Sequence, residues 1–203
     1  MKSITILEAL DVVEWVRENN PCAVLSIEHP GARRVSEGAA PRLIEEGIEG
    51  VDQRIQVYWD TEEDHPKGPS LRMVKAGLRF LLKHEKRSKR PLVVHCRQGK
   101  SRSVAMALAY LVAANRDKSI MECIAHLKTL RPEPAPNIKI IELADTALGL
   151  GNELVEAVKA DAQFTANRAA ANASRARWAE KNPESLKLPK LTPQKRGPKP
   201  KTP

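Results

Sequence analysis

Residues 91–103, PLVVHCRQGKSRS, constrain the fold of this chain more than any other stretch. Leu92, Val93 and Val94 form a short β-branched-rich run, which is typical of a fully buried parallel strand. Residues 104–115, VAMALAYLVAAN, follow a glycine-containing loop and are apolar enough to predict a core helix. A loop between a strand and a helix N-terminus directs several backbone N–H groups and the positive end of the helix dipole at one spot. The stretch therefore predicts an anion-binding loop.

The side chains of this loop suit phosphate chemistry. Cys96 stands at its mouth, where amides, the helix dipole and a nearby guanidinium favour the nucleophilic thiolate. Gly99 lets the backbone turn inward, and Arg102 can bind two phosphate oxygens at once. Ser103 can donate a hydrogen bond to the sulfur when it leaves. The competing interpretation of Cys96 is a buried structural cysteine at the end of a strand.

The letters HCRQGKSRS at residues 95–103 resemble the His-Cys-x-x-Gly-x-x-Arg-Ser signature of the cysteine-dependent protein tyrosine phosphatase superfamily. The Ser-Arg-Ser ending is closest to the dual-specificity type. A second similarity lies at residues 131–137, RPEPAPN, where the same family often shows Arg-Pro and Pro-Asn. The resemblance covers roughly residues 20–150. It implies an α/β fold with a central, mostly parallel sheet of about four to five strands flanked by helices.

The resemblance also implies roles for the residues of the loop. Cys96 is then the nucleophile of phosphomonoester hydrolysis through a cysteinyl-phosphate intermediate, and no metal or cofactor takes part. His95 and Ser103 support the nucleophile, and His95 orients the loop more plausibly than it transfers protons. The residues expected to bind the substrate phosphate are Arg97, Gln98, Gly99, Lys100, Ser101 and Arg102.

The general acid is expected in the polar loop after the strand predicted at residues 55–59. Catalytic groups of open α/β sheets gather at the carboxyl ends of strands, the edge at which Cys96 also lies. Asp60 follows that strand directly, and the resembled family has its acid roughly thirty to forty residues before the cysteine. A solvated acidic turn is the competing interpretation. The remaining candidates are Asp64, the main rival, and then Glu62 and Glu63.

Apolar patterns outside the loop predict the rest of the scaffold. Residues 28–50 predict a long surface connection with a short helix near 42–46. A further helix is expected to begin after Asp117 or Ser119. Residues 3–6 are either an edge strand or the lead-in to the next helix, and a further strand is predicted at 22–27. The other predicted helices are 7–19, 71–86 and 138–150.

Charge divides the chain into two parts. Most of the net charge of +9 falls in residues 164–203, whereas the preceding part is nearly neutral. We expect a cysteine phosphatase domain at residues 1–160 and a basic tail at 161–203 that is helical at first and disordered from about Pro183. Such a tail is solvated, or it binds polyanions such as nucleic acid non-specifically.

The cysteines and the N-terminal residues bear on localisation. Three scattered cysteines are too few for a disulfide framework or a zinc cluster, which implies a reducing compartment. Glu8 and Asp11 interrupt the stretch where a signal peptide needs an apolar core, and no segment is apolar enough to span a membrane. We expect a cytoplasmic protein.

The favoured function is a phosphatase acting on phosphotyrosine proteins, with phosphoserine and phosphothreonine as further targets. Arg97 and Lys100 add two cations to the loop, as in lipid-directed relatives, so a phosphoinositide or other polyanionic substrate is the alternative. A non-catalytic phosphate-binding or nucleic-acid-binding protein is the alternative from another class. Retention of Cys96 and Arg102 argues against the former, and an aromatic content of 3% argues against the latter.

Overall fold

The computed structural model describes residues 4–181, except for the side chains of residues 175, 176, 178, 179 and 181. The chain divides into two units, Met1–Ala169 and Ala170–Pro203, and the sheet and candidate site belong to the first. The disorder predicted from about Pro183 lies outside the described residues. None of the helices described combines the length and apolarity that a membrane span requires.

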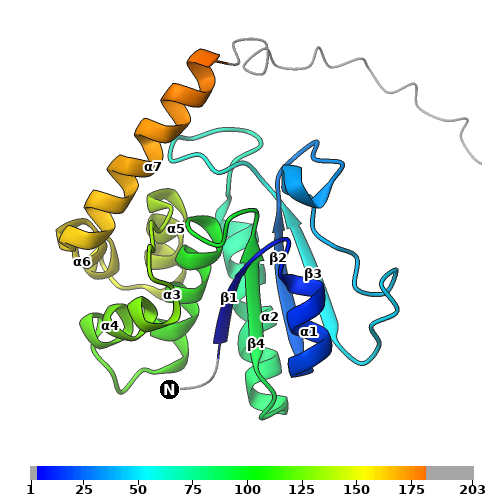
Figure 1. Ribbon diagram of the computed structural model, residues 1–203. Helices are drawn as coiled ribbons and strands as arrows, with labels where there is room; N and C mark the ends of the chain where they lie inside the picture. Colours follow the sequence, from blue (N-terminus) through cyan, green and yellow to red (C-terminus); the bar gives the residue numbers. More distant parts are fainter. Residues whose placement is uncertain (1–3, 182–203) are drawn as a thin grey trace, which may run out of the picture. The chain divides into compact units, whose positions relative to one another are not determined.

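A four-stranded sheet forms the centre of the first unit, with the strand order β1-β4-β2-β3 and every pair parallel (Figure 1). This arrangement confirms the predicted fold class. Val94 pairs with Ile6 of one neighbouring strand and with Leu25 of the other, so β4 is central and all its residues are buried. The strands are β1 (Ile4–Glu8), β2 (Ala23–Glu28), β3 (Asp52–Val57) and β4 (Leu92–Cys96).

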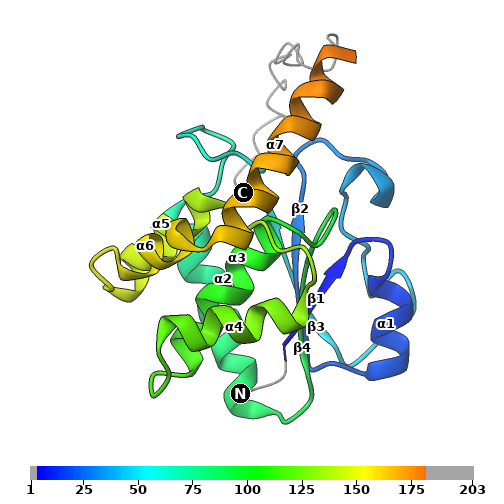
Figure 2. The same cartoon turned by 60° about the vertical axis from the view of Figure 1, so that its left-hand side comes forward.

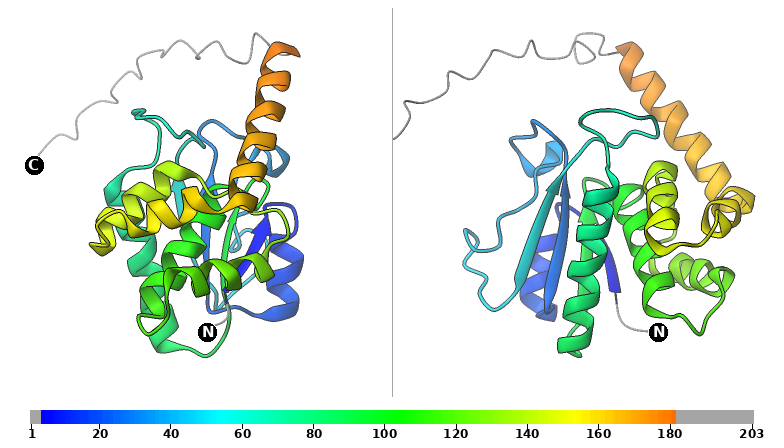
Figure 3. Two further views of the ribbon diagram at one scale, coloured as in Figure 1. Left: turned by 90° about the vertical axis from the view of Figure 1, so that its left-hand side faces the viewer. Right: turned by 180° about the vertical axis from the view of Figure 1, so that it is seen from behind.

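Eight helical segments surround or follow this sheet in the described part of the chain. They are α1 (Val12–Asn19), the 3-10 helix η1 (Val35–Glu37), α2 (Leu71–Arg87), α3 (Arg102–Ala114), α4 (Ile120–Leu130), α5 (Ile138–Leu148), α6 (Glu153–Ala160) and α7 (Ala162–Lys181). Helices α1 and α2 lie on opposite faces of the sheet, as the view from behind shows (Figure 3).

Alternation along the strands creates two apolar layers. Val24 and Val93 point to one face, where they pack with Val12 and Val16 of α1. Their strand neighbours point to the other face, against α2 and α3. Helix α3 is apolar on all sides because it lies between the sheet and the outer helices α4, α5 and α6 (Figure 2). The continuous apolar run after the loop therefore follows from burial on every side.

The structure confirms most predicted elements and shifts several of their ends. The edge strand near residues 3–6 extends to Glu8, so the helix predicted from residue 7 begins only at Val12. The strand predicted at 55–59 runs from Asp52 to Val57 and ends two residues early. The short helix predicted near residues 42–46 is absent, and residues 43–47 form turns instead.

Of the two residues, Asp117 and Ser119, after which helix α4 was expected to begin, Ser119 is the N-cap. Its hydroxyl accepts a hydrogen bond from Glu122 N at 3.2 Å, and the Glu122 carboxylate accepts one from Ser119 N at 2.8 Å. This reciprocal capping box satisfies amides that have no partner within the helix. Helix α4 therefore begins at Ile120.

Candidate active site

The loop between β4 and α3 is shaped by its close approach to β1. Gly99 has a φ of +64°, and a Cβ at this position would lie 2.7 Å from the carbonyl oxygen of Leu7. Ala9 N donates a hydrogen bond to Arg97 O at 3.1 Å, which fixes the loop from the same side. Glycine is therefore required here for both its backbone conformation and its lack of a side chain.

Arg102, at the first position of α3, is 3% exposed and is held by the ends of two strands. Its Nη1 donates hydrogen bonds to the carbonyl oxygens of Glu28 at 3.2 Å and Tyr58 at 2.9 Å. Its Nε has no hydrogen-bond partner among the described residues. The guanidinium is thus fixed by backbone groups, and a donor remains for a bound oxyanion.

The Cys96 thiol lies at the carboxyl end of β4, buried beside Ser103. Its Sγ is 3.1 Å from the Ser103 hydroxyl oxygen, and either atom can be the donor. The hydroxyl can stabilise a negative sulfur at this distance by donating its proton. The two side chains therefore contact each other where β4 leads through the loop into α3.

His95 is directed to the opposite face of the sheet from Cys96, because successive strand residues alternate. Its Nε2 lies within hydrogen-bond distance, 2.8 Å, of the Ser26 hydroxyl, and that hydroxyl also accepts a hydrogen bond from Gln53 Nε2 at 2.9 Å. Burial, the largest cause, lowers the pKa of His95 to about 3. The imidazole is neutral at ordinary pH and links β4 to β2.

Asp60 lies three residues beyond the end of β3 and reaches the loop. Its Oδ1 accepts hydrogen bonds from Ser101 Oγ and Asn137 Nδ2, both at 2.8 Å, and its Oδ2 is 3.8 Å from Arg102 Nε. The Asp60 side chain is 25% exposed. This carboxylate is therefore fixed beside the guanidinium and open to solvent on one side.

The other acidic candidates lie elsewhere. The Asp64 side chain is 93% exposed and pairs with Lys139 Nζ at 2.7 Å. Glu62 lies 3.6 Å from Arg168 Nε and accepts a weak hydrogen bond from Ile138 N at 3.4 Å. Glu63 is exposed. The structure thus brings Asp60 to the cysteine loop, whereas these three carboxylates face other partners or solvent.

Asn137 is a site residue whose role the sequence analysis missed. Its side chain donates to Asp60 Oδ1 and to Thr61 O at 3.1 Å, while its Oδ1 accepts from Ile140 N at 3.0 Å as the N-cap of α5. The Pro-Asn pair at the end of RPEPAPN was the sequence feature that could have indicated this role. Asn137 joins the start of α5 to the acidic loop.

The two extra cations of the loop both contact protein groups. Arg97 Nε donates to Ser36 O at 3.1 Å, and Lys100 Nζ forms an ion pair with Glu133. Residues 131–137 lie against the loop, since Ala135 N donates to Lys100 O at 2.8 Å. Neither cation is directed into the site as an isolated charge.

A stack of rings flanks the acidic loop and was not predicted. The Trp59 indole lies nearly parallel to His65, with ring centroids 4.4 Å apart, and to His29, with centroids 6.3 Å apart. Burial, followed by the charges of Arg102 and Arg97, lowers the pKa of His29. His29 is therefore a neutral ring at the edge of the site at physiological pH.

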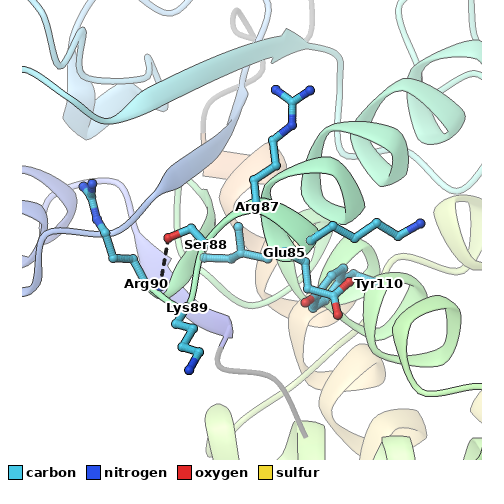
Figure 4. A pocket seen from close by; sticks show the side chains of 8 residues that line it. Glu85, Arg87, Ser88, Lys89, Arg90 and Tyr110 are labelled. Carbon is cyan, nitrogen blue, oxygen red and sulfur yellow. Dashed lines mark hydrogen bonds between the residues drawn. The ribbon is translucent and has the colours of Figure 1, made fainter.

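A pocket of about 480 Å³ lies at the opposite end of the sheet, where α2 ends and β4 begins (Figure 4). The Arg87, Lys89 and Arg90 side chains point in different directions around it. None of the candidate catalytic residues lines this pocket. Over the described residues, no group of three or more His, Cys, Asp or Glu side chains gathers in a way that would hold a metal ion.

Comparison with known proteins places this geometry in context. Residues 48–143 match the family described as "Dual specificity phosphatase, catalytic domain". No curated protein sequence matches the chain. Among solved structures, human DUSP28 is similar with a TM-score of 0.55 and 16% identity, over 75% of this chain and 95% of that one.

Two further structures share the fold. DUSP15 has a TM-score of 0.55 and 16% identity, over 77% of this chain and 90% of its own. PTPMT1, solved in complex with PI(5)P, has a TM-score of 0.54 and 19% identity, over 78% of this chain and 95% of its own. At these identities the similarity concerns the fold.

Proposed function

Because the chain is a dual-specificity-phosphatase-like member of the cysteine-dependent phosphatase superfamily, we propose that it hydrolyses phosphomonoesters with the Cys96 thiolate as nucleophile. One observation supports this most strongly. The buried Arg102 guanidinium is held by the carbonyl oxygens of Glu28 and Tyr58, and its Nε lies 3.8 Å from Asp60 Oδ2. Cys96 lies at the same edge of the sheet, at the end of β4. A nucleophile, an oxyanion donor and a carboxylate thus meet at one place.

In the first step, Cys96 Sγ attacks phosphorus in line and forms an S–P bond while the P–O bond to the leaving group breaks. Arg102 binds oxygens of the transferring group, on which negative charge is concentrated. Asp60 gives a proton to the leaving oxygen.

In the second step, water attacks phosphorus of the cysteinyl phosphate and the S–P bond breaks. Asp60, now ionised, removes a proton from the water. The Ser103 hydroxyl, 3.1 Å from Sγ, donates a hydrogen bond to the departing thiolate. Inorganic phosphate is released, and the thiolate is restored.

Phosphotyrosine proteins are the proposed substrates, with phosphoserine and phosphothreonine as further targets. Support comes from the Ser-Arg-Ser ending of the loop and from the contact of Lys100 with Glu133, which compensates one of the extra charges. The alternative is a phosphoinositide or another polyanionic phosphate. It is favoured by the exposed Arg97 and by the similarity of fold to PTPMT1.

Hydrolysis of an aryl phosphate in EDTA, measured between about pH 4 and 8, tests the proposal. We expect the wild type to be active and Cys96→Ser to be inactive. Arg102→Ala should lose most activity. Asp60→Asn should lose activity together with one limb of the pH profile, whereas Asp64→Asn should behave as wild type. An inactive wild type, or an active Cys96→Ser variant, would contradict the cysteine mechanism.

A further inference from the structure

The segment 131–137 places one carboxylate beside the cysteine loop. Arg131 Nη2 donates to Gln98 O at 2.9 Å, and Ala135 N donates to Lys100 O at 2.8 Å. Glu133 lies between these two anchors, so its backbone is held from both sides. Its side chain is 67% exposed and bonds to Lys100 Nζ.

The contact favours the charged form of Glu133. The hydrogen bond from Lys100, followed by the positive charge of Lys100, lowers the pKa of Glu133. Glu133 is therefore ionised throughout the range in which a phosphatase of this kind works. The Lys100 charge is thus compensated where the loop meets solvent.

This pairing bears on the number of phosphates that the site accepts. Arg102 is buried and is assigned to the reacting phosphate. A second phosphate on the same substrate would lie outside the loop and would need an uncompensated cation near the rim. Lys100 is placed to supply that charge, but Glu133 engages its ammonium group and adds a repulsive charge of its own.

We propose that Glu133 is a specificity-determining residue that selects singly over doubly phosphorylated substrates by engaging Lys100. The inference rests on the proposed function, because it concerns the substrate of the same site. The loop contains two extra cations, Arg97 and Lys100. Because the exposed Glu133 carboxylate neutralises Lys100, only Arg97 remains to attract a second phosphate.

The test compares two peptides of identical sequence, one with a single phosphotyrosine and one with a second phosphate two residues away. The measured quantity is the ratio of kcat/KM for the doubly and the singly phosphorylated peptide. We expect Glu133→Gln, which keeps the shape and removes the charge, to raise this ratio about fivefold, the size of one exposed ionic contact. The matched control is Glu45→Gln, an exposed glutamate in the turn before β3, which changes net charge equally and should leave the ratio unchanged.

A Lys100→Met background shows whether the effect acts through the lysine. There, Glu133→Gln should no longer change the ratio. A ratio unchanged by Glu133→Gln in the native background, or a rise that persists without Lys100, would overturn the inference while leaving the hydrolase intact. A wild type that hydrolyses neither peptide, and no aryl phosphate, would instead overturn the proposed function and this inference with it.

Discussion

At the scale of single residues, the Asn137 side chain makes two hydrogen-bonding interactions, one with Asp60 and one with the start of α5, and mutation can separate them. Its side chain caps α5 through Ile140 N and also holds Asp60 Oδ1. Asn137→Ser should retain the cap but is too short to hold Asp60. We expect stability close to wild type and a fall in kcat of about tenfold for substrates with poor leaving groups, because these depend on the general acid.

Steady-state kinetics on alkyl and aryl phosphates, together with urea denaturation, would check this prediction. Asn137→Ala is the companion variant and should additionally lose about 1 kcal/mol of stability with the cap. Equal losses of kcat for good and poor leaving groups would show that Asn137 does not act through Asp60.

His95 gives a prediction about acid stability. Its pKa is about 3 in the folded protein, below the ordinary value of 6.5, so below about pH 6.5 the unfolded chain binds a proton that the folded protein does not. The contribution of neutral His95 is therefore complete above pH 6.5 and is lost as the pH falls toward 3. We expect the free energy of unfolding to decrease by up to about 1.4 kcal/mol per pH unit from this group.

Urea unfolding at several pH values in this interval measures the slope. His95→Gln should make the slope shallower, whereas His126→Gln, which removes a partly exposed histidine of α4, should change it little. Identical slopes in wild type and His95→Gln would rule out the buried imidazole as the cause.

At the scale of the elements, the contact of the cysteine loop with β1 is open to test through Gly99. Its positive φ and the 2.7 Å approach to Leu7 O both oppose a side chain. Gly99→Ala should lose about 1–3 kcal/mol of stability and more than tenfold in activity. Gly47→Ala is the matched control, because Gly47 has a φ of +70° with open space around its Cα.

Chemical denaturation and aryl phosphate hydrolysis distinguish the two variants. Gly47→Ala measures the backbone cost alone, so the difference between the variants reports the close approach to Leu7. Equal stability and equal activity of both variants would show that the loop tolerates a displaced β1.

The sequence predicts best those helices and strands whose formation follows from the apolar pattern of their own residues. Helix α3 and strand β4 are read from continuous apolar runs, and both were predicted within one or two residues. Strand β3 was displaced because its first residues, Asp52 to Arg54, are polar and lie on an edge of the sheet, where burial is incomplete. Tyr58 resembles a strand residue, but its carbonyl serves Arg102 instead of a neighbouring strand.

The same distinction applies to the candidate site. The proximity of Cys96 and Ser103 follows from one contiguous stretch, so it could be predicted. The sequence favours Asp60 over Asp64 from its position directly after a strand, but it could not predict the hydrogen bond from Asn137, a residue distant in sequence, that holds Asp60 beside the loop. Glu133 was likewise missed, since nothing local to Lys100 indicates its partner.

At the scale of the whole molecule, the effect of a C-terminal truncation on stability and activity depends on the residue at which it begins. Removal of residues 182–203 takes away much of the basic tail and leaves the described residues intact. We expect hydrolysis of an aryl phosphate within about twofold of wild type, and weaker, less salt-dependent retention on a heparin column. Undiminished retention would show that the tail does not bind polyanions.

Removal of residues 164–203 should behave differently. Phe164 is fully buried in the main apolar core, and Asn167 donates to Pro134 O at 3.0 Å. We expect this deletion to lose about 3 kcal/mol or more and to lower activity at moderate temperature. Thermal unfolding of the two truncated proteins measures the contrast, and equal melting temperatures would contradict it.

The parallel pairing of β1 with β4 sets a limit on the order of folding. Ile4 pairs with Leu92 and Glu8 with Cys96. During synthesis, β1 therefore leaves the ribosome long before its partner strand β4 is made. Contacts of such long sequence separation make folding slow. A nascent chain that ends before β4 holds β1 as an unpaired apolar segment, which invites chaperone binding or aggregation. The nucleophile and its loop are thus completed in the same late event that closes the sheet.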